Sequence, residues 1–139
     1  MDLYMRITNP DIHGDSRAKA FANEFELYSL SYSAVNVGGR STLTPITVTL
    51  AAYNGPLLIG AVVDGRSHDV RFSIVKPSTS TGAPTIFETI TLTKATITSF
   101  REIANAGDDR PTLELSFAYQ GLTYVQADNK STFTYPLKA

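Results

Sequence analysis

Hydrophobic and polar residues alternate along most of this 139-residue chain, with the two-residue period of β-strands that bury one face. The clearest run is at residues 113–120, where Leu113, Leu115, Phe117 and Tyr119 alternate with polar or small neighbours. Asn, Asp, Gly and Pro separate the runs, as expected for strands joined by turns. The strands predicted in this way cover residues 3–8, 21–34, 46–50, 70–75, 85–100, 113–120, 122–127 and 132–137.

Two of these runs change their apolar face partway along. Phe25 and Leu27 occupy odd-numbered positions, whereas Leu30 occupies an even-numbered one. The same kind of change occurs between Leu92 and Ala95. Because side chains alternate along a strand, such a change requires a β-bulge or a strand that is covered on both faces. We therefore predict a mainly β protein, built as a barrel or a sandwich.

One segment, residues 54–65, favours a helix. Pro56 suits the first turn, where its missing N–H would have no partner, and Gly65 suits the left-handed residue that ends a helix. Leu58 and Ala61 share one face, yet apolar residues also occupy the other faces, which is typical of a helix buried all round. We expect this helix to lie between a sheet and a neighbouring subunit. A buried strand is the alternative, because the run is also rich in β-branched residues.

The connections are predicted from glycine, proline and polar residues. Residues 35–44 contain Gly38-Gly39 and few apolar side chains, so we expect a long exposed loop that contributes little to the core. The other predicted loops and turns cover residues 11–17, 78–84, 105–111 and 128–130.

The composition of the chain reduces the number of possible functions. The length suits one domain, residues 1–139, with 42% hydrophobic residues for its core. No run of about 18 apolar residues is present, and residues 1–6 lack the features of a secretory signal peptide. The net charge of −1 gives no electrostatic reason to expect nucleic acid or anionic lipid as a partner. The absence of cysteine excludes disulfides and thiol catalysis.

The candidates for chemistry are His13, Asp15 and Ser16 in one segment, and His68 and Asp69 in another. A metal site needs three or four converging ligands, and these two groups lie on separate connections. A Ser–His pair would also need a third member and an oxyanion site, and the glycine between His13 and Asp15 indicates a turn. We interpret all five as polar turn residues, and we predict no catalytic residue, no metal ligand and no cofactor.

Five tyrosines occupy alternating positions in the predicted strands, and two roles are open to them. They could form a face on which sugar rings stack, which would indicate a carbohydrate-binding β-sandwich. They could instead pack the barrel or its interface, which is the role we favour. They are Tyr28, Tyr32, Tyr119, Tyr124 and Tyr135.

Four segments share their order and similar spacing with one known family. Ile12-His13-Gly14-Asp15-Ser16 follows the first strand and is similar to the family's I-x-G-E-S segment, with Asp in place of Glu. Residues 24–32, EFELYSLSY, are similar to its E-I-x-V-x-S-F-S-W strand. Residues 56–65 open with Pro-Leu-Leu and end with Gly, as its S-P-x-L helix does, and residues 114–124 are close to its C-terminal hairpin. Together these segments resemble the Hcp family, the haemolysin-coregulated tube proteins of bacterial type VI secretion systems.

The resemblance implies a β-barrel of antiparallel strands with one short flanking α-helix. It implies a structural subunit without enzymatic activity, which forms hexameric rings that stack into the inner tube of a contractile injection machine. The expected partners are further copies of the chain, sheath and spike proteins, and effectors carried in the lumen, with no nucleic acid and no direct membrane insertion. The tube would be assembled in the bacterial cytoplasm and secreted without a signal peptide.

The resemblance also gives residues 35–44 a role, because the family's extended loop reaches towards the adjoining ring. The chain departs from the family at residues 47–53, where many members carry a Lys-rich segment, and after Tyr124, where it extends beyond the usual ending. These departures concern surfaces that meet neighbours more than the fold. Phage tail-tube proteins, whose fold is similar, are the nearest alternative.

Overall fold

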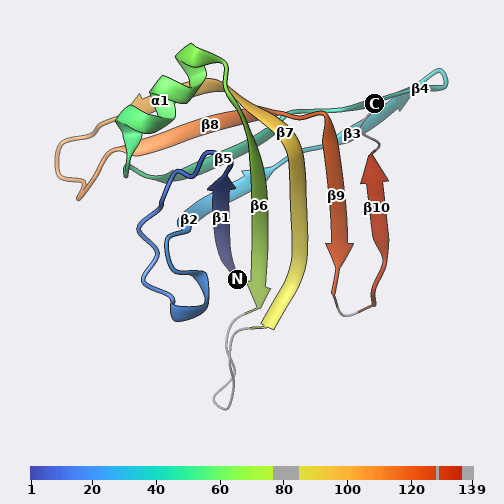
Figure 1. The fold of residues 1–139 in the computed structure, drawn as a ribbon, viewed down its shortest axis with the longest axis horizontal. Helices are drawn as coiled ribbons and strands as arrows, with labels where there is room; N and C mark the ends of the chain where they lie inside the picture. Colours follow the sequence, from blue (N-terminus) through green and yellow to red (C-terminus); the bar gives the residue numbers. More distant parts are fainter. Residues whose placement is uncertain (77–84, 128, 136–139) are drawn as a thin grey trace.

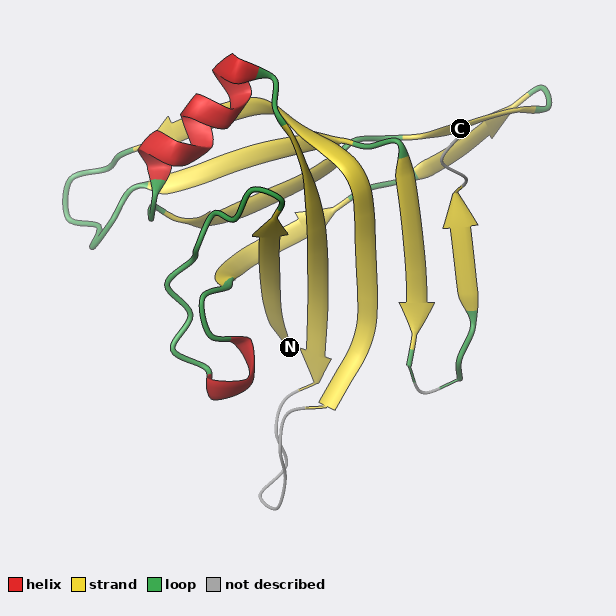
Figure 2. Cartoon of the chain, in the orientation of Figure 1, coloured by secondary structure: helices red, strands yellow, loops and turns green. Residues whose placement is uncertain are grey.

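The structure is a computed structural model, and it describes residues 1–76, 85–127 and 129–135. Strands dominate this part of the chain, with one α-helix and one short 3-10 helix (Figure 2). The strands are β1 (Asp2–Thr8), β2 (Phe25–Ser31), β3 (Ala34–Val37), β4 (Arg40–Leu43), β5 (Ile46–Ala51), β6 (Ser67–Lys76), β7 (Thr85–Ile103), β8 (Thr112–Ala118), β9 (Gly121–Gln126) and β10 (Thr132–Tyr135). The helices are α1 (Gly55–Asp64) and the 3-10 helix η1 (Lys19–Phe21).

Six of the strands close into a barrel. They pair in the order β7–β6–β1–β2–β5–β8, all antiparallel, and β8 pairs back with β7. The long strand β7 makes this closure possible, because residues 88–93 pair with β9 while residues 96–103 pair with β8. The hairpin of β9 and β10 continues the sheet beyond the closed part (Figure 1). Closure removes the free edges that an open sheet of these strands would have.

The inward-facing residues of the barrel strands form the core. Every second residue of β5 and β8 is buried, as the alternation in the sequence predicts. The rings of Phe72 and Phe117 meet edge to face inside, with their centroids 5.9 Å apart. The predicted fold class, a β-barrel of antiparallel strands with one short flanking α-helix, is confirmed.

The two predicted changes of face are also confirmed. The pairing of β2 with β5 shifts register between Leu27 and Ser29, which is where a bulge is needed. In β7 the backbone of Lys94 has a positive φ of 49°, between the two residues whose parity differs. Each irregularity turns the following apolar side chains back to the core.

The predicted start of the second strand is wrong by four residues. Residues 21–24 precede β2, because η1 and the left-handed backbone of Asn23 turn the chain just before Phe25. Phe21 instead stacks on Tyr4 outside the barrel, with ring centroids 4.2 Å apart. Together with Val75 these rings form a second, smaller buried cluster, so β1 and β6 are covered on both faces.

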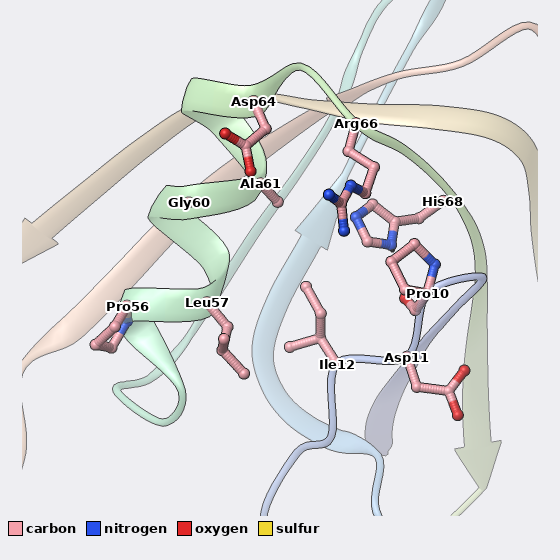
Figure 3. A pocket seen from close by; sticks show the side chains of 10 residues that line it. All are labelled: Pro10, Asp11, Ile12, Pro56, Leu57, Gly60, Ala61, Asp64, Arg66 and His68. Atoms are coloured by element: carbon pink, nitrogen blue, oxygen red, sulfur yellow. Dashed lines mark hydrogen bonds between the residues drawn. The ribbon is translucent and has the colours of Figure 1, made fainter.

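The helix α1 is confirmed, with Pro56 in its first turn. It ends at Gly65, whose left-handed backbone lets its N–H donate to the carbonyls of Ala61 and Val62. Leu58 and Ala61 are buried against the barrel, beside β7. The opposite side of the helix is open, since Ile59 and Val63 are exposed, while the exposed Leu57 lies on the flank that faces Ile12 (Figure 3).

The predicted loop at residues 35–44 is a β-hairpin, so that prediction is wrong about its structure. β3 and β4 pair from Ala34–Leu43 to Val37–Arg40, and Gly38-Gly39 is the two-residue turn between them. Both glycines have positive φ, 58° and 85°, as the preferred hairpin turn requires. The prediction that the segment is exposed holds, and Figure 1 shows the hairpin projecting away from the barrel.

The other connections follow the sequence with some exceptions. Residues 105–111 form the irregular link between β7 and β8, as predicted. The predicted loop at residues 78–84 lies outside the described residues, as do residue 128 of the last turn and residues 136–137 of the last predicted strand.

Within the described part of the chain, α1 is far too short to cross a bilayer, and it is the sole α-helix there.

Candidate functional site

The segment from His13 to Ser16 lies beside the start of β2. Gly14 donates its N–H to the carbonyl of Asn23 at 2.9 Å, and Ser16 donates to the carbonyl of Glu24 at 2.8 Å. A Cβ on Gly14 would overlap the backbone of Glu24 and Phe25. The glycine is therefore needed for close backbone contact, which corrects the interpretation that it marks a turn.

The side chains of this segment point to separate partners. The carboxylate of Asp15 accepts a hydrogen bond from Arg110 at 2.7 Å, which also raises the pKa of Arg110. His13 is exposed, with its Nε2 3.8 Å from a carboxylate oxygen of Asp11. The hydroxyl of Ser16 accepts the N–H of Ala18 at 3.2 Å. This geometry does not bring Ser16 and His13 together as a nucleophile and a base.

His68 and Asp69 also have separate surroundings. The Nδ1 atom of His68 lies 2.8 Å from the carbonyl oxygen of Pro10, and its ring is buried. Asp69 accepts a hydrogen bond from the side chain of Asn9 at 2.7 Å. Among the described residues, no three His, Cys, Asp or Glu side chains gather as a metal site would require.

Four of the five candidate tyrosines gather at the end of the barrel next to the β9–β10 hairpin. Tyr32 meets Tyr124 edge to face at 6.4 Å, and Tyr119 meets Tyr135 in the same way at 6.3 Å. Burial raises the pKa of Tyr32 to about 12, helped by Tyr124 and Glu88. Within each pair the two rings lie nearly perpendicular, and the partly buried members pack on the core, as the packing interpretation expects.

Tyr28, the fifth, stands apart on β2 with 65% of its surface exposed. The tyrosines therefore do not form one continuous face. The sequence predicted all five on strands, but Tyr32 and Tyr119 lie just beyond the ends of β2 and β8. The pattern could not show which tyrosines meet, because their contacts join segments that are distant in the sequence.

Many of the large exposed apolar residues lie on three surfaces. The helix surface is the open side of α1, with Ile59 and Val63. The hairpin surface is formed by Val35 and Val37 of β3. The edge surface is formed by Phe133 and Tyr135 of β10, which pairs on one side with β9 and with no second strand in the described part of the chain.

The sequence pattern predicts the helix surface but not the edge surface. The alternation in residues 132–137 predicts a strand with one buried face, yet every residue of β10 is exposed. The hairpin surface was expected as a loop, because its valines are too few to show a strand period. The signal that could have identified it is Gly38-Gly39, a two-residue glycine turn of the kind that joins the strands of a hairpin.

Solved structures support the same fold. The chain is similar to the Hcp1 protein from the E. coli EAEC 042 pathovar, with a TM-score of 0.86 and 14% identity over 100% of this chain and 99% of that one. It is similar to secreted protein Hcp3 from Pseudomonas aeruginosa, with a TM-score of 0.80 and 14% identity over 99% of both chains. It also matches a type VI secretion system effector from Yersinia pestis, with a TM-score of 0.79 and 19% identity over 96% of this chain and 97% of that one.

Identity this low shows a shared fold alone, and no curated protein sequence matches the chain. Membership of a family rests instead on the sequence model of the family described as "Type VI secretion system effector, Hcp", which matches residues 4–125. The match begins within β1, includes the rest of the barrel, α1 and the β3–β4 hairpin, and ends near the end of β9. The chain belongs to the Hcp family of type VI secretion system effectors.

Proposed function

We propose that this protein is the structural subunit of a type VI secretion tube, in which six copies form a ring and the rings stack. The family match supports the general role. The number of subunits and the stacking are proposals that rest on the resemblance and on the surfaces described above. We assign the chain no catalytic role.

The observation that carries the proposal is the position of the exposed apolar residues. The barrel is closed, and Val63 and Val37, at 79% and 72% exposed, lie outside its core. Apolar side chains grouped on a projecting hairpin and on a helix indicate contact with other chains. The helix, hairpin and edge surfaces lie on different elements, which suits subunits that join head to tail into a ring.

The β3–β4 hairpin is the element we assign to stacking. It extends away from the barrel, and the residues of both strands are largely exposed (Figure 1). In a ring the same contact would be repeated by every subunit, so a weak contact per subunit would add up to stable stacking.

The finer parts of the proposal concern cargo and location. We propose that the ring encloses a lumen that carries effectors, and that sheath and spike proteins surround and cap the stacked tube. Assembly would take place in the bacterial cytoplasm, and the tube would then be expelled. A phage-like tail tube would use the same ring and differ in its surrounding machinery.

Light scattering coupled to size-exclusion chromatography tests the ring directly. We expect a mass of about six chains at micromolar concentration, and electron microscopy should show rings with a central channel. A protein that stays monomeric up to high micromolar concentration would contradict the proposal. Binding of simple sugars by such a monomer would instead support the carbohydrate-binding alternative.

A further inference from the structure

A pocket of about 210 Å³ opens on the hairpin of β9 and β10, where the sheet continues beyond the closed barrel (Figure 1). This edge pocket is lined by Tyr124, Gln126, Ser131, Thr132 and Phe133. Because Tyr124 and Phe133 are paired residues on adjacent antiparallel strands, their side chains lie on the same face of the sheet. Phe133 is 48% exposed, so another molecule can contact its ring.

The rings of Tyr124 and Phe133 form two separate aromatic walls of the edge pocket. They make no ring contact with each other in the described part of the chain, and Tyr124 instead meets Tyr32 edge to face. The face of an aromatic ring carries partial negative charge, so it attracts a cation.

Glu88 of β7 places a carboxylate beside the same pocket. Its Oε1 accepts hydrogen bonds from the hydroxyl of Tyr124 at 3.0 Å and from the side-chain amide of Gln126 at 2.9 Å. Its other oxygen, Oε2, accepts no hydrogen bond among the described residues, and it is not buried. Oε2 is therefore open to a donor from another molecule.

The negative charge of Glu88 is not compensated within the described residues. The side chain is half-buried, both of its donors are neutral, and it forms no ion pair, not even with Lys130 on the turn before β10. Burial raises the pKa of Tyr124, and the hydrogen bond and charge of Glu88 raise it further. A partly buried charge without a counterion is unfavourable, so the edge pocket favours a cationic ligand.

A guanidinium group combines the properties that this pocket requires. It is smaller than benzene, for which a cavity of about 150 Å³ is sufficient. It is planar and weakly hydrated, it stacks on aromatic rings, and its N–H groups donate to carboxylates. A metal ion would need further ligands, and no three His, Cys, Asp or Glu side chains gather among the residues that the structure describes. In a protein, the guanidinium group is that of an arginine side chain.

We propose that the edge pocket binds an arginine side chain of another protein. The guanidinium group stacks on the exposed ring of Phe133 and donates a hydrogen bond to Oε2 of Glu88. The edge surface, which includes Phe133, thereby receives a partner of defined chemistry, a polypeptide segment that presents an exposed arginine. The contact does not depend on ring assembly, so either proposal can fail without the other.

A pair of peptides tests the charge of the ligand. Acetyl-Gly-Arg-Gly-amide should bind wild type at millimolar concentration, and in an NMR titration it should shift the resonances of residues 88, 124–126 and 131–133. The matched peptide carries citrulline, which has nearly the same shape without the charge, and it should bind about tenfold more weakly. Added salt should weaken the binding of the arginine peptide and leave that of the citrulline peptide unchanged.

Two substitutions test the two parts of the pocket. Glu88→Gln removes the charge with little change of shape and should weaken binding of the arginine peptide about tenfold. Phe133→Leu removes the aromatic wall but keeps an apolar side chain, and should weaken binding about fivefold. The matched controls are Glu102→Gln, at an exposed carboxylate elsewhere on β7, and Tyr28→Leu, at an exposed ring on β2. Neither control should change binding.

Thermal melting shows whether each variant folds. If Glu88→Gln does not fold, the exposed Phe133 and the comparison of peptides on wild type keep the test decisive. Equal binding of the two peptides, or unchanged binding in Phe133→Leu, would overturn the proposal. Binding of methyl glucoside at the same resonances, without binding of the arginine peptide, would also overturn it and assign the pocket to a sugar. A monomeric protein that binds the arginine peptide as expected would contradict the ring and support the edge pocket.

Discussion

A carboxylate oxygen of Glu24 lies 2.9 Å from the guanidinium group of Arg71, although the two side chains have very different surroundings. The Glu24 side chain is 2% exposed and that of Arg71 is 44% exposed. Burial raises the pKa of Glu24, and the attraction and hydrogen bond of Arg71 oppose that shift without cancelling it. The second oxygen of Glu24, Oε1, has no hydrogen-bond partner among the described residues.

This arrangement predicts a specific pH dependence of stability. Because the pKa of Glu24 is higher in the folded state, its contribution to the free energy of unfolding is fully present below pH 4.5, the ordinary pKa. That contribution is lost as pH rises through the raised value. Wild type should therefore gain stability relative to Glu24→Gln as pH falls from about 7 to about 4, measured by urea unfolding.

The control for this prediction is Glu26→Gln, which removes an exposed carboxylate two residues along the chain. Its difference from wild type should vary less with pH. A difference between wild type and Glu24→Gln that stays constant over the same range would contradict the assigned pKa shift.

A second prediction compares two glycines. Gly14→Ala should destabilise the fold by about 3 kcal/mol or more, because the new Cβ would overlap backbone that cannot rotate away. Gly60→Ala should stabilise it by up to about 1 kcal/mol, because the Cβ has free space and alanine favours a helix. Thermal melting of both variants tests this prediction. Melting temperatures that change by a similar amount in the same direction would contradict the close contact at Gly14.

A third prediction concerns the β3–β4 hairpin. Replacing residues 36–41 by Asn-Gly keeps Val35 opposite Thr42 and supplies a favoured two-residue turn. The shortened hairpin should change the free energy of unfolding by about 1 kcal/mol or less, because the removed residues are exposed. Rings should still form, while stacking and secretion decrease.

Melting temperature, ring mass and electron microscopy distinguish the possible results. A variant that no longer folds would show that the hairpin supports the barrel. Tubes that form as readily as in wild type would place the stacking surface elsewhere on the ring.

A fourth prediction concerns the helix surface. Ile59→Ser with Val63→Ser should weaken ring formation while changing the free energy of unfolding by about 1 kcal/mol or less, because both side chains are exposed on the isolated chain. Leu58→Ser, one residue away on the buried face, is the contrasting variant and should lower the melting temperature strongly. Normal ring formation by the first variant would show that the helix surface is not part of the subunit interface.

The sequence by itself determined the features that depend on neighbouring residues. The alternation of apolar and polar residues predicted which faces of β5 and β8 are buried. It could do so because successive side chains in a strand point to opposite faces. Pro56 and Gly65 marked the two ends of α1, because each has a backbone preference that does not depend on distant contacts. The parity changes near Leu27 and Lys94 likewise predicted irregularities that the strand pairing shows.

Contacts between distant segments were decided by the tertiary structure alone. The closure of the barrel requires β7 to pair with β9 along one half and with β8 along the other, and no local pattern in residues 85–103 encodes that division. The role of Gly14 depends on the backbone of Glu24, and the Nδ1 atom of His68 lies beside the carbonyl oxygen of Pro10, 58 residues away in the sequence. Such contacts arise from how the strands pack in space, so the residues that make them look in the sequence like ordinary loop glycines and histidines.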